Sequence, residues 1–348
     1  MSDFAFELPE HLIAQHPRAR GASRLLVVDR AAGTWQESRV ADLPRWLRAG
    51  DLLVANDSRV FPARLLGRRP GGGRAECLLL EPEGSDWWAL VNPGPKLQTG
   101  VRIDFTDPDR AAGVTLAGEV LDVDATGRRR IRLTAAGATV SGAIDRLGHI
   151  PLPPYIRRAD TDDDRARYQT MFAKWTGSIA APTAGLHFDD DLVAALDAAG
   201  IARAAVTLHV GYGTFKPVKV EDTRDHRVDP ERWEVTPAAA AAVAGARARG
   251  GRVVAIGTTT TRALESAARD SGVVVPGAGA TDLCITPGYR FAAIDALLTN
   301  FHLPQSSLLM LVSAFAGREL VLEAYRDAVA RGFAFYSYGD AMLILPEV

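Results

Sequence analysis

Three histidines occupy segments in which an imidazole could move a proton. His187 lies in AAPTAGLHF, His209 in TLHVGYGTF and His302 in TNFHLP. Each stands near glycine, proline or threonine, at the expected end of a strand or helix. Ligands in open α/β sheets gather at the carboxyl ends of the strands, and imidazole titrates near neutral pH. The three histidines therefore indicate a ligand site, and a structural role is the alternative for each of them.

Small and hydroxyl-bearing residues accompany these histidines. Thr183 precedes His187, and Gly211 and Gly213 follow His209 along an expected strand. Glycine lets a backbone approach a ligand closely. Thr183, Gly211 and Gly213 are therefore candidate ligand contacts.

A second constellation is the junction between an apolar strand at 253–256 and a helix. Gly257 is followed there by Thr258, Thr259 and Thr260. The first amides of a helix lack intrahelical partners and lie at the positive end of its dipole, so the junction could hold a phosphate or carboxylate. Neither the P-loop nor the dinucleotide-binding glycine pattern occurs. A capped helix without a ligand is the alternative.

Asp57 follows another apolar strand, expected at 52–55, in the segment NDSR. Its side chain would emerge at the strand end, where a carboxylate could bind ribose hydroxyls or a cationic ligand. Capping of a turn is the alternative.

Several classes of protein are disfavoured. The histidines lack the HExxH spacing of zinc enzymes, and the GxSxG pattern of serine hydrolases is absent. The two cysteines, Cys77 and Cys284, are far apart, which suits a reducing cytoplasm rather than a disulfide framework. No apolar run reaches the roughly 20 residues of a membrane span, and no signal peptide is apparent. We therefore expect a cytoplasmic protein with no metal and no membrane association.

Arginine clusters could still provide a local basic surface on a chain whose net charge is −2. Arg59 stands in the NDSR segment. The first cluster consists of Arg64, Arg68 and Arg69, and the second lies between Arg128 and Arg132 and includes Arg130. Guanidinium groups fork onto phosphate oxygens, so these residues are candidate contacts to a nucleic acid. Solvated surfaces are the alternative.

The elements that must position these residues fall into two groups. Strands are expected at 52–55, 204–208 and 253–256, and helices at 40–47, 162–172, 189–199, 237–249, 258–269, 306–316 and 319–330. Short strands separated by turns are expected instead at 76–80, 87–91, 102–105, 114–123 and 130–133. We predict an α/β main domain with a mostly parallel sheet over residues 1–66 and 145–348. An inserted all-β, barrel-like domain is predicted over residues 67–144.

Six long segments, in this order, resemble the S-adenosylmethionine:tRNA ribosyltransferase-isomerases of queuosine biosynthesis. They are VANDSRVFPARLLG, GHIPLPPYI, SIAAPTAGLHF, TLHVGYGTFKPV, AIGTTTTRALESAA and TNFHLPQSSLLMLVSAFAG. The resemblance runs from FELPEHLIAQHP near the start to YSYGDAMLI near the end. It implies an α/β domain with a β-barrel insertion, in a monomer.

The resemblance also implies the reaction. The ribosyl part of S-adenosylmethionine is transferred to 7-aminomethyl-7-deazaguanine at the wobble position of tRNA and is isomerised. The products are epoxyqueuosine-tRNA, adenine and methionine. S-adenosylmethionine is consumed as a cosubstrate, and no other cofactor is implied.

This chemistry suggests roles for the candidate residues. The sulfonium acidifies the hydrogens of the 5′ carbon, so a base must remove one of them, and His187 and His209 are the candidates. His302 and Asp57 are expected to act as orienting groups for the substrates in the site. The turn from Gly257 through Thr258 and Thr259 to Thr260 is expected to hold the methionyl carboxylate. Asp282, in TDLCITPG, is expected to bind the ammonium or the ribose.

One position departs from the family pattern. The family usually carries a histidine shortly after the position of His226, where this chain has Asp229. An aspartate accepts a proton but cannot donate one as an imidazolium does. The substitution is either a neutral change on a loop or the sign of a paralogue with a small-molecule acceptor. A tRNA-binding protein without activity is a third hypothesis, which the presence of His187, His209 and His302 disfavours.

Overall fold

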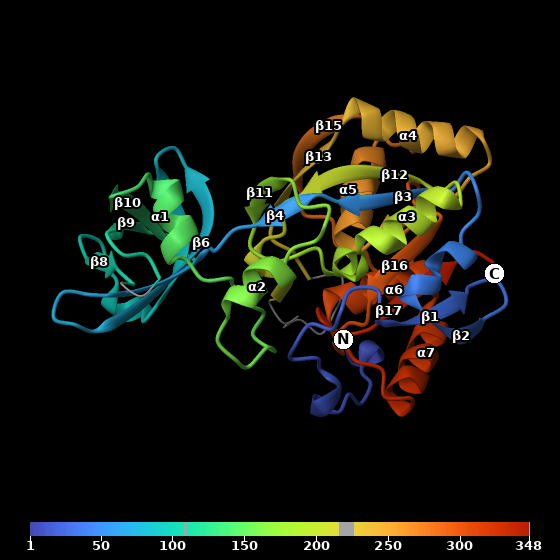
Figure 1. Ribbon diagram of the computed structural model, residues 1–348, viewed down its shortest axis with the longest axis horizontal. Helices are drawn as coiled ribbons and strands as arrows, with labels where there is room; N and C mark the ends of the chain where they lie inside the picture. The colour runs from blue at the N-terminus through green and yellow to red at the C-terminus, as the bar shows by residue number, and fades with distance from the viewer. Residues whose placement is uncertain (108–109, 216–225, 348) are drawn as a thin grey trace.

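A computed structural model describes residues 1–107, 110–215 and 226–347 (Figure 1). It contains a large α/β unit and, on the left of Figure 1, a smaller β-barrel. A two-stranded parallel ribbon lies where the two units meet, formed by β4 (Ser58–Val60) and β11 (Trp175–Ser178). The predicted combination of an α/β domain and a barrel is thus confirmed.

The large unit is organised around a nine-stranded sheet. Its four central strands, β12, β3, β14 and β16, run parallel, and antiparallel strands extend the sheet on both sides. The sheet is therefore mixed, with its parallel part at the centre. In order across the sheet the strands are β15 (Gly277–Thr281), β13 (Glu231–Val235), β12 (Ala202–Leu208), β3 (Leu52–Asn56), β14 (Val253–Ile256), β16 (Ala296–Asn300), β17 (Ala341–Leu345), β1 (Arg24–Asp29) and β2 (Thr34–Arg39).

The central strands are apolar along their whole length because both sides of the sheet are covered. Leu52 and Val54 of β3 pack into one core, and Leu53 and Ala55 pack into another. This alternation is what the pleat of a strand requires. On the first side lie α4 (Pro237–Ala248), α5 (Thr258–Ala268), α6 (Ser307–Ala316) and α7 (Arg318–Ala330). On the second side lie α3 (Asp190–Ala198) and the 3₁₀ helix η3 (Val40–Arg45).

The helices differ from the sequence expectation in two places. The segment expected to be helical at 40–47 forms a 3₁₀ helix, and it contains Pro44, which cannot donate the hydrogen bond an α-helix needs. The helix expected at 162–172 is α2 (Asp162–Arg167), which begins with a capping box of Thr161 and Asp164 and ends early. Further 3₁₀ helices are η1 (Ser2–Phe4), η2 (Glu10–Leu12), η4 (Gly94–Lys96), η5 (Thr183–His187) and η6 (Tyr212–Phe215).

The barrel is a closed antiparallel sheet with its own apolar core. Helix α1 (Val140–Leu147) contributes Ala143, Ile144 and Leu147 to that core. The division of the chain at residues 67 and 144 stays a prediction. In order around the barrel the strands are β10 (Arg129–Ala136), β7 (Asp86–Asn92), β6 (Arg74–Glu83), β5 (Arg64–Arg68), β8 (Arg102–Phe105) and β9 (Thr115–Val123).

None of the helices in the described part of the chain is long and apolar enough to cross a membrane.

One residue fixes how the central sheet passes into its covering helices. Gly257 joins β14 to α5 with φ +89° and ψ 159°, a region that only glycine occupies without strain. A Cβ at this position would also lie 3.3 Å from the Cβ of Ala184. Gly257 therefore allows α5 to begin directly at the end of the strand.

We predict that Gly257→Ala lowers the free energy of unfolding by about 1–3 kcal/mol, the usual cost of a non-glycine residue in such a conformation. Gly245→Ala, within α4, is the matched control, since alanine is favoured over glycine in a helix by about 0.5–1 kcal/mol. Urea unfolding of both variants measures this. Equal free energies of unfolding for Gly257→Ala and the wild type would contradict the conclusion that the backbone at this position requires glycine.

Candidate functional site

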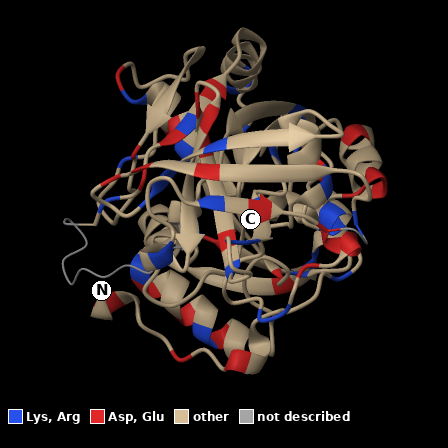
Figure 2. Ribbon diagram, turned by 90° about the vertical axis from the view of Figure 1, so that its left-hand side faces the viewer, with Lys and Arg blue, Asp and Glu red and all other residues tan. Residues whose placement is uncertain are grey.

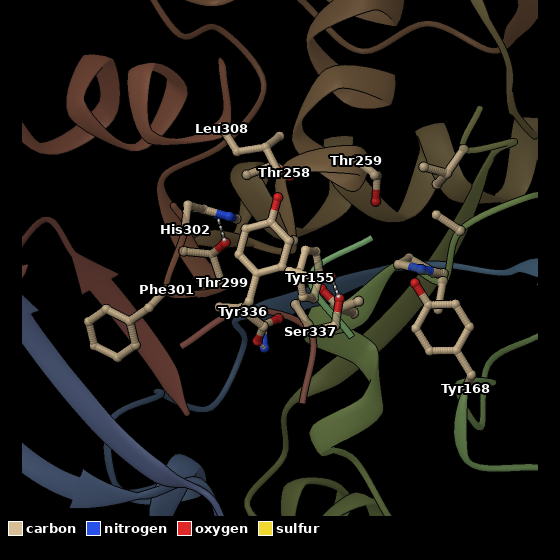
Figure 3. Close-up of a pocket in the computed structure, with 18 residues that line it drawn as sticks. Tyr155, Tyr168, Thr258, Thr259, Thr299, Phe301, His302, Leu308, Tyr336 and Ser337 are labelled. Carbon is tan, nitrogen blue, oxygen red and sulfur yellow. Dashed lines mark hydrogen bonds between the residues drawn. The ribbon is translucent and has the colours of Figure 1, made fainter. Parts of the chain in front are cut away.

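A cavity opens where the parallel strands end, and we call it the strand-end cavity (Figure 3). Gly257, Thr258 and Thr259 reach it from the β14–α5 junction, and residues 299–302 reach it from the end of β16. The remaining walls come from residues 180–184, Val210 after β12, Leu308 of α6, and the side chains of Tyr155, Tyr168, Tyr336 and Ser337. Segments from distant parts of the chain thus converge at one edge of the sheet.

His302 is the only one of the three predicted histidines that lines this cavity. Its Nε2 lies 3.0 Å from Thr299 Oγ1, and its backbone N–H donates to the hydroxyl of Tyr325 at 3.2 Å. Burial lowers the pKa of the His302 imidazole to about 3, because a charged ring loses its hydration there. His302 is therefore neutral at physiological pH and can accept a proton.

His187 lies behind the cavity wall, and both of its ring nitrogens have partners. Nδ1 is 3.0 Å from Ser23 Oγ, and Nε2 is 3.1 Å from Asn300 Nδ2. Burial lowers its pKa to about 4. Both ring nitrogens of His187 are therefore engaged by protein partners, and the choice of His187 as the proton-abstracting base stays a prediction.

His209 also lies outside the cavity wall. Its Nδ1 is 2.8 Å from Ser58 Oγ, which is in turn 2.6 Å from Ser178 Oγ. The ring packs on Gly177, where a Cβ would lie 2.6 Å from Nδ1. Burial, with a smaller effect from Arg232, lowers the pKa of His209. His209 joins β12 to the β4–β11 ribbon.

Asp57 occupies the same junction and does not line the cavity. Its Oδ1 accepts a hydrogen bond from the Thr207 hydroxyl at 2.6 Å, and its carbonyl accepts one from Lys174 N at 2.7 Å. Burial raises the pKa of the Asp57 carboxyl, and the Thr207 hydroxyl and nearby Lys174 oppose that rise. Its contacts make Asp57 a link between β3, β12 and β11, rather than the orienting group expected from the sequence.

The β14–α5 junction has the form expected of an anion site. No described side chain caps the first turn of α5, because its N-cap is Gly257. Thr258 and Thr259 line the cavity, and Thr259 Oγ1 accepts from Asn56 Nδ2 at 3.2 Å. Thr260 lies outside the wall, because its hydroxyl donates back to Ile256 O at 2.7 Å. Only part of the predicted threonine turn therefore faces the cavity.

The other predicted ligand contacts are dispersed. Thr183 lines the strand-end cavity. The N–H of Gly211 donates to Glu231 Oε1 at 2.8 Å. Gly213 and Asp229 line a neighbouring cavity that shares Leu308 with the first. Asp282 is exposed and lines neither cavity, so its predicted contact with the cosubstrate is not supported. Residues 216–218, at the end of the TLHVGYGTFKPV segment, lie outside the described residues.

Sequence analysis missed the tyrosines of the cavity. Tyr155 and Tyr336 contact each other edge to face with ring centroids 3.8 Å apart, and the hydroxyls of Tyr155 and Ser337 share a short hydrogen bond. Tyr336 has φ +76°, an unusual conformation for a bulky residue. Both tyrosines stood in segments typical of the family, GHIPLPPYI and YSYGD. Only the fold reveals that these segments meet.

Comparison with known proteins identifies the family. The family described as "Queuosine biosynthesis protein" matches residues 1–344. A relative from Anaeromyxobacter dehalogenans (strain 2CP-C), named S-adenosylmethionine:tRNA ribosyltransferase-isomerase, is 53% identical, and the match covers 99% of each chain. The chain belongs to the queuosine biosynthesis protein family.

Two further members of this family are also similar. A relative of the same name from Gloeobacter violaceus is 51% identical, with 99% of this chain and 95% of the relative covered. The solved structure of an S-adenosylmethionine tRNA ribosyltransferase from Thermotoga maritima is 37% identical. The structural match has a TM-score of 0.56 and covers 99% of this chain and 100% of that one. The family match therefore extends over both the large unit and the barrel.

The two arginine clusters do not form one basic surface, contrary to expectation. Strand β5, with Arg64 and Arg68, is three strands away from β10 in either direction around the closed barrel. The clusters therefore lie on opposite sides of it. Four of the seven arginines in the two clusters are also paired with acids: Arg64 with Glu76, Arg128 with Asp124 and Glu81, Arg130 with Glu83, and Arg132 with Asp86.

Two arginines beside these pairs make other contacts. Arg68 donates to Gly72 O at 3.1 Å, and Arg69 packs against Gly73. Figure 2 shows basic and acidic residues interspersed on the side that carries the barrel.

Acid should destabilise this member of the family through its buried histidines. The unfolded chain binds a proton at each histidine below about pH 6.5, whereas the folded chain binds none at His187 or His302 until about pH 4 or 3. The contribution of these two histidines to the free energy of unfolding is therefore nearly constant above pH 6.5 and falls as the pH drops below that value. We predict a loss of roughly 2 kcal/mol per buried histidine between pH 7 and pH 5.

Urea unfolding at the two pH values measures this loss. His187→Gln should reduce it, because glutamine retains polar partners but does not titrate. His16→Gln is the control, since His16 is exposed. The same pH dependence in wild type and His187→Gln would contradict the prediction.

Proposed function

We propose that this chain transfers and isomerises the ribosyl part of S-adenosylmethionine onto 7-aminomethyl-7-deazaguanine in tRNA. The products are epoxyqueuosine-tRNA, adenine and methionine. The observation that carries the proposal is the strand-end cavity, with an uncapped helix terminus on one side and tyrosines on the other. The names of the relatives support the same reaction.

The cavity suits the two ends of S-adenosylmethionine. The first backbone N–H groups of α5, at Thr258 and Thr259, would donate hydrogen bonds to the methionyl carboxylate, because a helix N-terminus favours negative charge. The rings of Tyr155 and Tyr336 would flank the adenine and the sulfonium, since aromatic faces attract both flat rings and cations. Thr183 adds a hydroxyl to the same wall.

His302 is the base that we propose in place of His187 and His209. The sulfonium acidifies the C5′–H bond, and a neutral imidazole beside the cavity can take the proton. The low pKa of His302 makes it a weak base, so the sulfonium must supply most of the activation. The same low pKa makes the imidazolium a strong acid, which suits return of the proton to the departing adenine. The C1′–N9 bond breaks and adenine keeps its electron pair, the acceptor amine forms a C–N bond to the sugar and gives up one proton to solvent, and the C5′–S bond breaks with its electron pair kept by methionine.

The β4–β11 ribbon is the surface that we propose for the anticodon loop. Trp175 of β11 is 54% exposed, and Lys174 Nζ lies 4.9 Å from the centre of its ring. An exposed tryptophan beside a cation is suited to stack an unpaired base next to a phosphate. Arg59 is exposed on the paired strand β4. β11 leads directly into Ala180 and Ala181 of the cavity wall.

The oligomeric state, location and cofactor needs of the protein are also part of the proposal. We propose a monomer in the cytoplasm, where the free thiols Cys77 and Cys284 would stay reduced. We also propose that S-adenosylmethionine is a consumed cosubstrate and that the reaction needs no metal or other cofactor.

One incubation tests the function. The protein is supplied with S-adenosylmethionine and tRNA that carries the precursor base, and the digested tRNA is analysed by mass spectrometry. The expected result is epoxyqueuosine with one equivalent of adenine. A parallel reaction with free 7-aminomethyl-7-deazaguanine tests a small-molecule acceptor. Product from the free base but not from tRNA would overturn the proposal in favour of the paralogue.

The choice of base predicts the effect of pH and of substitution. The rate of adenine release should show no histidine titration between pH 6 and pH 8, because His302 is neutral throughout. His302→Gln should lower kcat by about 10²–10⁴-fold, the usual contribution of a general base. His209→Gln is the control and should cost less than about tenfold, since His209 lies outside the cavity. The reverse order of effects would contradict the assignment.

The tRNA surface predicts a selective effect on one substrate. Trp175→Ala should raise KM for tRNA by about 5- to 150-fold, because stacking on an aromatic ring contributes about 1–3 kcal/mol. KM for S-adenosylmethionine should not change. Trp175→Phe should retain most of the affinity for tRNA, and Val273→Ala, at a residue 56% exposed elsewhere on the surface, should have no effect. Unchanged tRNA affinity in Trp175→Ala would place the anticodon loop on another surface.

A further inference from the structure

Asn300 lines the strand-end cavity and carries a buried oxygen without a hydrogen-bond partner among the described residues. The residue is 3% exposed and lines the cavity at the end of β16. Its Nδ2 donates to the carbonyl of Tyr336 at 3.1 Å. Its Oδ1 is buried and has no hydrogen-bond partner in the described part of the chain. Buried polar atoms are nearly always satisfied, so this oxygen points to a missing ligand group.

The orientation of the Asn300 amide is set by its neighbours. The carbonyl of Tyr336 can only accept, so the NH₂ group must face it, and a flipped amide would bring two oxygens together. His187 Nε2, 3.1 Å from the same NH₂ group, must then be an acceptor. The ring proton of His187 is therefore on Nδ1 and is donated to Ser23 Oγ at 3.0 Å. This chain of hydrogen bonds explains why both nitrogens of His187 are engaged.

A second unsatisfied group faces the same cavity. Tyr168 is fully buried, and its hydroxyl lies near the backbone of Ala181 and the side chain of Ser337 without a hydrogen bond of normal geometry among the described residues. In Figure 3 this hydroxyl points toward the other residues of the wall. An unsatisfied buried polar group costs about 1–3 kcal/mol. Two such groups on one cavity favour a ligand with polar atoms at both positions.

We propose that Asn300 Oδ1 accepts a hydrogen bond from the exocyclic amine of the adenine ring, with His187 as the positioning residue that holds the amide. The inference rests on the proposed function, in which S-adenosylmethionine occupies this cavity. An amide oxygen requires a donor, and the amine is the adenine ring's donor group. Tyr336, which lines the wall and whose carbonyl accepts from Asn300, provides an aromatic surface of the kind a purine prefers.

The proposal makes Asn300 a determinant of specificity. In the hypoxanthine counterpart of S-adenosylmethionine, a carbonyl oxygen replaces the amine. Two acceptors would then face each other in a buried site, and such mismatches are rejected strongly. The protein should therefore discriminate between two cosubstrates that differ at this one group.

The experiment compares base release from the two cosubstrates in the presence of precursor tRNA. The wild type should prefer the adenine compound by at least about 100-fold in kcat/KM. Asn300→Ala should reduce this ratio to less than about tenfold, because the opposing oxygen is gone. His187→Phe should lower the ratio while leaving the pH profile unchanged. A ratio is independent of the fraction of protein that is folded, so a purely structural role would not alter it.

Thr183→Ala is the matched control, since it changes the same cavity and should leave the ratio unchanged. A wild-type ratio near one, or a ratio that Asn300→Ala leaves intact, would overturn the inference while the proposed function stands. Release of neither base would instead refute the proposed function, and the inference with it.

Discussion

The structure depends on one constraint, which is that the parallel strands β12, β3, β14 and β16 all end at the same edge of the sheet. Each strand must there pass into a helix or loop, and a side chain at Gly257 would have little room beside Ala184. Asn56 shows how tightly these passages are connected. The side-chain NH₂ group of Asn56 donates to the carbonyl of Leu208 and to the hydroxyl of Thr259. Its side-chain oxygen accepts from the backbone N–H of Leu208. The first turn of α5 has no side-chain cap at this edge, and the strand-end cavity lies beside it.

Burial decides which of the polar side chains at this edge can act. Three histidines lie here, and burial lowers the pKa of each one. His187 and His209 are held between protein partners and orient other groups. His302 combines burial with a place on the cavity wall. The difference between a structural and a chemical histidine therefore lies in which atoms surround it, since the three residues share one type and similar local sequence.

Much of the architecture could be predicted from periodicity. The apolar strand at 253–256 and the helices that begin near 237, 258 and 307 lie close to where the sequence placed them. The site was only partly predictable. Thr183, Thr258, Thr259 and His302 reach the cavity, but Asp57, His209 and Asp282 do not. Tyr168 and Tyr336 escaped prediction because no local pattern places them beside residues more than 100 positions away in the chain. The prediction of a basic surface from the two arginine clusters was limited for the same reason, because the order of strands in the barrel places the clusters on opposite sides.

The central claim is that S-adenosylmethionine binds in the strand-end cavity with its two ends in a fixed direction. A crystal structure of the protein with S-adenosylmethionine tests this most directly. We expect the methionyl carboxylate at the amides of Thr258 and Thr259, and the adenine amine within hydrogen-bond distance of Asn300 Oδ1. Binding of the cosubstrate in the neighbouring cavity beside Asp229, or in the reverse direction within the same cavity, would contradict the claim.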